Sequence, residues 1–88
     1  MKGIITVVGH DRVGIIAQIC TFLSAQNVNI LDISQTIVQE YFNVLMIVQF
    51  GGQASFEDIA RGLSELSTTM DMEIKLQRED IFESMHRV

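Results

Sequence analysis

Several residue types that would point to other classes of protein are rare or missing in this chain of 88 residues. It contains no proline, so no stretch has the composition of a stiff linker between domains. A single cysteine excludes a disulfide within the chain. Six lysines and arginines stand against eleven aspartates and glutamates, giving a net charge of -5. Nucleic acids and acidic membrane surfaces are therefore disfavoured as partners, because phosphate binding needs clustered positive charge.

Long apolar runs are also missing. None approaches the roughly 20 residues that a membrane-spanning helix requires, and no segment reads as a signal peptide. These absences predict a soluble, cytoplasmic protein. Apolar residues make up 48% of the chain, which suffices for one hydrophobic core and leaves no room for a second. A domain this small gains from further burial, so we expect a homodimer or a higher homo-oligomer.

The hydrophobic periodicity predicts four strands and two main helices. We expect strands over about 2–8, 28–39, 42–50 and 70–77. The first helix is expected to start near 12–14 and to run to about 26, and the second to cover about 55–66. Two right-handed βαβ crossovers then give an α+β fold, a ferredoxin-like βαββαβ sandwich with a four-stranded antiparallel sheet and both helices on one face. The single domain spans 1–88, with a core of about 1–78 and a short C-terminal helix over about 79–88.

The ends of the helices carry recognisable capping residues. Asp11 is expected to cap the first helix, because its carboxylate can accept from free amides two or three residues on. Asn27 suits the left-handed position that ends that helix. Ser55 is expected to cap the second helix, with Asp58 in a capping-box position.

The strands differ in which of their faces are apolar. In 28–39 the pattern puts Leu31, Ile33 and Ile37 on one face. The strand over 42–50 is largely apolar on both faces, with Leu45 and Ile47 on the second. That pattern is typical of a central strand, or of one whose open face meets another subunit. The strand over 70–77 has one polar face, as at a sheet edge.

The most informative segment joins the first strand to the first helix and reads Gly9-His10-Asp11-Arg12-Val13-Gly14-Ile15-Ile16. A glycine-flanked loop that leads into a helix concentrates unpaired amide N–H groups at the positive end of the helix dipole. Such a place suits a small anion, for example a carboxylate. The loop has no pair of nucleophile and base, so binding is favoured over catalysis.

The pattern Gly9-x-Asp11-Arg12-x-Gly14-Ile15-Ile16, followed by Asn27-Val28-Asn29-Ile30, resembles the signature of ACT domains. These are small regulatory modules that bind amino acids and related ligands. The resemblance covers residues 1 to about 78. The length, the segment 33–36 and the tail resemble the small stand-alone ACT proteins of bacteria and archaea.

The resemblance implies that subunits pair side by side through sheet edges and hold a ligand near their boundary. The ligand-binding residues that it implies are Asp11, Arg12, Val13, Gly14 and Ile15 on the loop and Asn29 facing them. It implies no cofactor and no metal. The chain carries no enzyme or DNA-binding domain, so a signal would pass to a separate enzyme or regulator. Many members have proline at the position of Val13, so the loop is less rigid here.

Each of these residues also has a purely structural interpretation. Gly14 either lets a ligand approach the amides or allows tight packing of the helix start on the first strand. Asn29 either binds a ligand or satisfies loop backbone, and Arg12 either clamps a carboxylate or is solvated. His10 could act as a pH switch but has no second ligand nearby for a metal. Cys20 belongs to the apolar stripe of the first helix and is expected to be a buried small residue.

Three functions compete at this point. The first is a non-catalytic regulatory module that binds an amino acid or a similar small ligand at a homodimer interface. The second is an interaction module without a ligand, which docks a partner through an apolar sheet face or the tail helix (Leu45, Ile47, Ile81, Phe82 and Met85). The third is an enzyme similar to acylphosphatases, suggested by Arg12 and Asn29. In that family the loop continues into Gly-x-x-Phe-Arg, whereas here Ile15-Ile16-Ala17 follow Gly14.

Overall fold

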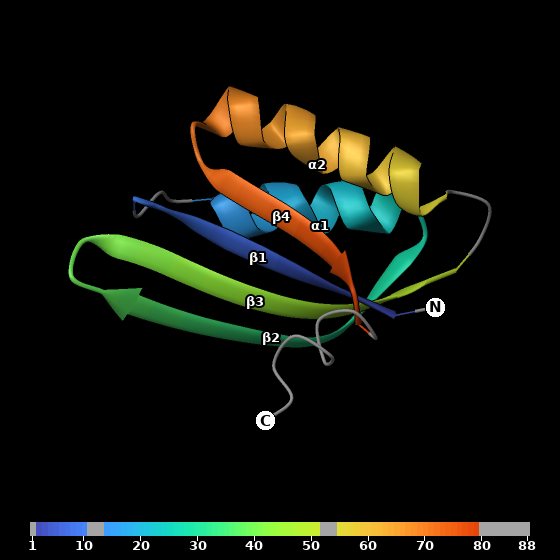
Figure 1. Ribbon diagram of the computed structural model, residues 1–88, viewed down its shortest axis with the longest axis horizontal. Helices are drawn as coiled ribbons and strands as arrows, with labels where there is room; N and C mark the ends of the chain where they lie inside the picture. Colours follow the sequence, from blue (N-terminus) through green and yellow to red (C-terminus); the bar gives the residue numbers. More distant parts are fainter. Residues whose placement is uncertain (1, 11–13, 52–54, 80–88) are drawn as a thin grey trace.

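Strands and helices alternate along the chain in the expected βαββαβ order. The computed structural model describes residues 2–10, 14–51 and 55–79 (Figure 1). The elements are β1 (Lys2–His10), α1 (Ile15–Ala25), β2 (Val28–Val38), β3 (Tyr41–Phe50), α2 (Phe56–Met70) and β4 (Glu73–Arg78). The C-terminal helix expected over 79–88 lies, beyond Glu79, outside the described residues. No helix in the described ranges has the length and apolar character needed to cross a membrane.

The four strands form one antiparallel sheet in the order β2-β3-β1-β4. Strand β3 pairs with β1 along one side and with β2 along the other, and β4 adds to the outer side of β1. The prediction of a ferredoxin-like α+β sandwich is confirmed, as are the central place of β3 and the edge place of β4. Since β3 is antiparallel to both neighbours, β1 and β2 run parallel to each other.

The hydrophobic core lies between the helices and one face of the sheet. β1 contributes Ile5 and Val7, both fully buried, and β3 contributes alternate residues that include Met46. The helices supply one apolar stripe each: Ile15, Ile19 and Leu23 from α1, and Ile59, Leu63 and Met70 from α2. On the opposite face, Leu45 and Ile47 are half-buried. They are therefore not the exposed docking residues that the interaction-module hypothesis requires.

Strand β2 is mostly exposed, unlike the other three strands. Figure 1 shows both helices toward the β1 and β4 side of the sheet, with β2 at the far side. A β-bulge shifts the pairing of β2 with β3 between Ile30 and Asp32, so that Leu31 has no partner in the ladder. The spacing predicts that Leu31 shares one face with Ile33 and Ile37, and this prediction is wrong because of the bulge. The Leu31 side chain is 45% exposed. Ile37 is 63% exposed because the helices do not reach the hairpin end.

The predicted caps at two helix ends are confirmed. Asn27 has φ 59°, the left-handed conformation that ends α1. The Ser55 side chain accepts a hydrogen bond of 3.1 Å from the Asp58 amide at the start of α2. The predicted start of the last strand at residue 70 is wrong: α2 continues to Met70 and ends at Asp71, also left-handed (φ 55°). Met70, at the end of α2, and Met72, after the turn, are both buried. Their spacing of two residues in the sequence therefore resembles the alternation of a strand.

The two helices approach each other closely at Gly62 of α2. A Cβ atom at this position would overlap the ring of Phe22 on α1. Glycine in a helix interior is less favourable than alanine by about 1 kcal/mol, so its presence here is explained by the close approach of the Phe22 ring.

We therefore expect Gly62→Ala to lower the free energy of unfolding, although alanine is the better helix former. Steric overlap of this kind costs about 1–3 kcal/mol. Urea unfolding followed by circular dichroism measures the change. Ser64→Ala, at an exposed site of the same helix, is the control and should not destabilise the protein. In a Phe22→Ala background, Gly62→Ala should become neutral or stabilising, and an equal loss in both backgrounds would contradict the explanation.

Candidate functional site

The candidate site begins at the N-terminus of α1. The cap residue of this helix is Gly14, in the left-handed conformation (φ 87°, ψ 0°), with no side-chain hydrogen bond at the cap. The prediction that Asp11 occupies the cap position is therefore wrong. The helix begins three residues later than expected for that cap, because Gly14 supplies the reversal that leads into it.

Backbone donors are concentrated at this helix start. The first bond of the helical ladder runs from the Gln18 amide to the Gly14 carbonyl, at 3.0 Å. The amides of Ile15, Ile16 and Ala17 precede it and have no acceptor within the helix. No acidic side chain stands in the first turn of α1. Aligned free amides at the positive end of a helix favour a small anion such as a carboxylate.

The role of Gly14 follows from its backbone and not from packing. A Cβ atom at this position would have no heavy atom of another described residue within 4 Å, apart from its chain neighbours. The interpretation that Gly14 allows tight packing of the helix on β1 is therefore wrong. Among the described residues the space beside it is open, and the positive φ is the reason for glycine.

The remaining loop residues of the predicted site divide into two groups. Asp11, Arg12 and Val13 lie outside the described residues. The side chain of Ile15 is 1% exposed and belongs to the core, so only its backbone amide is available at the helix start.

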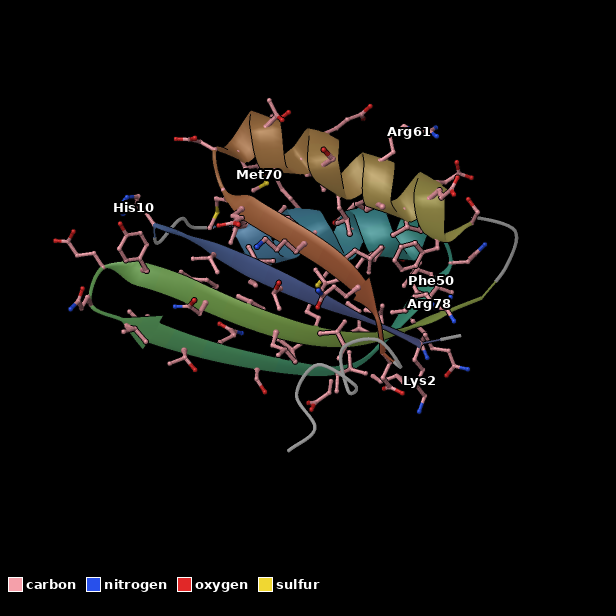
Figure 2. The ribbon with its side chains drawn as sticks, viewed as in Figure 1. Lys2, His10, Phe50, Arg61, Met70 and Arg78 are labelled. Atoms are coloured by element: carbon pink, nitrogen blue, oxygen red, sulfur yellow. The ribbon has the colours of Figure 1, made fainter. Side chains whose placement is uncertain are left out.

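Asn29 lies at the other end of the sheet from this helix start. It pairs with Gln49, which also pairs with Lys2 at the beginning of β1, whereas the loop follows His10 at the end of β1. Figure 2 shows Lys2 and Phe50 at one end of the molecule and His10 at the other. Eight steps along a strand correspond to about 26 Å. One copy of the chain therefore does not bring Asn29 and the helix start to the same ligand.

Asn29 lines a groove between α1 and the start of β2, with a volume of about 540 Å³. Cys20 and Ser24, one helical turn apart on α1, and Asn27 in the following turn also line it. Cys20 is half-buried, as a member of the helix stripe that lies at the margin of the core. The i, i+4 spacing of Cys20 and Ser24 is the sequence signal for a shared helix face, but the groove also depends on how β2 leaves the turn.

Comparison with known proteins identifies relatives over nearly the whole chain. Residues 3–77 match the family model described as the ACT domain. A UPF0237 protein of Bifidobacterium longum is 51% identical over 88 residues, which cover 99% of this chain and 98% of that protein. Among solved structures, an ACT domain protein from Streptococcus pneumoniae superimposes with a TM-score of 0.83 at 36% identity, covering 94% of each chain.

The same fold also occurs within a longer protein. A formyltetrahydrofolate deformylase from Pseudomonas putida superimposes with a TM-score of 0.77 over 88% of this chain. The match takes up 28% of that chain, and the sequences are 15% identical, so the likeness concerns the fold alone.

The conformation of Gly14 predicts the effect of replacing it. Gly14→Ala should destabilise the protein by about 1–2 kcal/mol, the cost of a left-handed backbone with a Cβ atom. Gly14→Asn should lose less, because asparagine tolerates this conformation better. Chemical denaturation of the three proteins compares them. A stabilising alanine would contradict the argument, as would equal losses for both variants.

Proposed function

The chain belongs to the ACT domain family, and on that basis we propose that it is a non-catalytic regulatory module. In this proposal it binds an amino acid or a similar small ligand at the boundary between two copies and transmits the binding to a separate protein. The observation that carries the proposal is the start of α1, where the described residues leave open space beside Gly14 and three amides have no acceptor within the helix. A ligand carboxylate would accept hydrogen bonds from these amides.

A second copy of the chain would complete the site. Strand β2 pairs with β3 along one edge only, and within the described residues its outer edge has no partner. Unpaired strand edges are templates for further pairing. If two β2 strands pair antiparallel about a two-fold axis, the beginning of β2 in one copy lies beside the end of β2 in the other. Asn29 of one copy then lies at the end of the sheet where α1 of the other copy begins.

The carboxamide of Asn29 offers both a donor and an acceptor, which suits the ammonium and carboxylate groups of an amino acid. The same geometry argues against the acylphosphatase-like alternative. That mechanism needs the loop and the asparagine beside one phosphoryl group, and within one chain Asn29 lies at the opposite end of the sheet.

Ligand binding can be followed at Cys20, the only cysteine of the chain, which lines the groove beside Asn29. We expect at least one common amino acid to raise the melting temperature and to slow the alkylation of Cys20. A ligand at 100 times its Kd stabilises the folded state by about 2.7 kcal/mol.

Asn29→Ala should abolish both effects, because it removes the carboxamide. Asn43→Ala, which removes a carboxamide from β3 opposite Val8 and Thr36, is the matched control and should leave both unchanged. If no amino acid changes either the melting temperature or the alkylation rate, the ligand assignment fails.

Pairing through β2 makes a separate prediction about assembly. Leu31→Lys together with Ile37→Lys should convert the dimer into monomers, since both side chains are exposed on the edge strand and burying charge is unfavourable. Sedimentation velocity measures the mass. Thr21→Lys with Ser64→Lys adds the same charge on exposed helix positions and should leave the dimer intact. A monomeric parent protein, or a dimer that survives both edge lysines, would refute pairing through β2.

A further inference from the structure

A second groove lies at the end of the sheet where β1 finishes. It has a volume of about 530 Å³ and is lined by the end of β1, the beginning of β3 and the turn that joins α2 to β4. Neither Gly14 nor Asn29 lines it, so it is distinct from the groove beside Asn29. Figure 2 shows His10 and Met70 toward this end of the molecule.

One wall of the groove is aromatic. His10 and Tyr41 are cross-strand partners, and their rings stack with centroids 5.0 Å apart and an angle of 28° between the planes. Tyr41 remains 47% exposed, so part of the ring is available to a ligand. The face of a tyrosine ring attracts cations.

The opposite wall is the C-terminal end of α2, which carries negative charge. The carbonyl end of a helix is the negative end of its dipole, and the last turn of α2 contains no basic residue to offset it. Asp71 and Glu73 follow directly and line the groove. The Glu73 carboxylate forms an ion pair with Lys75 at 3.1 Å, whereas Asp71 has no ion pair with any other described residue.

The Ser67 and Thr68 hydroxyl groups in this wall both donate their hydrogens to backbone carbonyls. Ser67 donates to the Met72 carbonyl, and Thr68 donates to the Ser64 carbonyl at 3.3 Å. A hydroxyl has one hydrogen and two acceptor lone pairs, so both oxygens are left as acceptors. On this side the groove therefore presents acceptors and negative charge, and a ligand there must donate hydrogen bonds.

We propose that this groove binds an organic cation, a primary ammonium or a guanidinium group. The Asp71 carboxylate forms the charge-assisted hydrogen bond, the Ser67 and Thr68 oxygens accept further hydrogens, and the exposed part of the Tyr41 ring attracts the same positive charge. The proposal does not rest on the amino-acid site described above.

Tyr41 is the only tyrosine, and the chain has no tryptophan, so the intrinsic fluorescence comes from a residue that lines this groove. The probes are n-butylammonium and n-butylguanidinium, with n-butanol and butyrate as neutral and anionic counterparts of similar size. We expect a saturable change of Tyr41 emission with a cationic probe and none with the other two.

Asp71→Asn should weaken cation binding about tenfold, the usual size of one lost charge-assisted contact. Asparagine tolerates the left-handed backbone of position 71, so the turn is kept. Glu57→Gln removes the same charge at the other end of α2 and should leave binding unchanged.

Three outcomes would overturn the proposal: no saturable response to either cation, an equal response to butyrate, or undiminished binding by Asp71→Asn. Protection of Cys20 by the cations with unchanged Tyr41 emission would place them in the groove beside Asn29 and would also overturn it. Because the two grooves have different reporters, failure at Tyr41 leaves the amino-acid test at Cys20 unaffected.

Discussion

The position of β3 between β1 and β2 is the constraint on which the rest of the structure depends. Antiparallel pairing on both sides makes β1 and β2 parallel, so the end of β1 and the beginning of β2 lie at opposite ends of the sheet. The fully buried side chains of β1 and β3 hold this arrangement against the helices. Each copy therefore carries the two halves of the candidate ligand site far apart, and the proposed function requires assembly before binding.

The fold was predictable because its signals are local and repeat along each element. Alternating residues of β3, the stripe of α2 and the Ser55 cap each identify an element without knowledge of its neighbours. The errors fall where two elements meet. Met70 and Met72 continue a strand-like alternation across a helix end, and Leu31 leaves its expected face because of a bulge that depends on pairing with β3.

The candidate site was predictable in type but not in arrangement. The sequence places a glycine-flanked loop before the first helix and Asn29 after it, and the structure shows Gly14 at the helix start and Asn29 near the start of β2. Nothing local in the sequence shows that Gly14 has φ 87° or that no described side chain packs beside it, because both depend on the packed structure. The groove at the end of β1 is formed by three segments distant in sequence, so its lining follows only from the packed structure. The groove beside Asn29 is lined by residues within 20–30, but it also depends on how β2 leaves the turn after α1.

The two helices present opposite polarity to ligands. The beginning of α1 offers amide donors, and the end of α2 offers carbonyls, hydroxyl oxygens and carboxylates. Both lie toward the end of the sheet where β1 finishes, since each helix runs antiparallel to the strands that flank it in sequence. In the two proposals above, a carboxylate binds at the first of these helix ends and an organic cation binds at the second.

The bulge at Leu31 limits how far such sheets can grow. It leaves Leu31 without a partner in the pairing with β3, and a bulge of this kind bends and twists the strand locally. Among the described strands the other edge of the sheet is β4, which is six residues long and carries the Glu73 and Lys75 charges. Short, charged edge strands resist edge-to-edge pairing with a strand of another molecule. In the proposed dimer the two β4 strands would form the outer edges of the joined sheet, and their short length and charges would disfavour the addition of further copies.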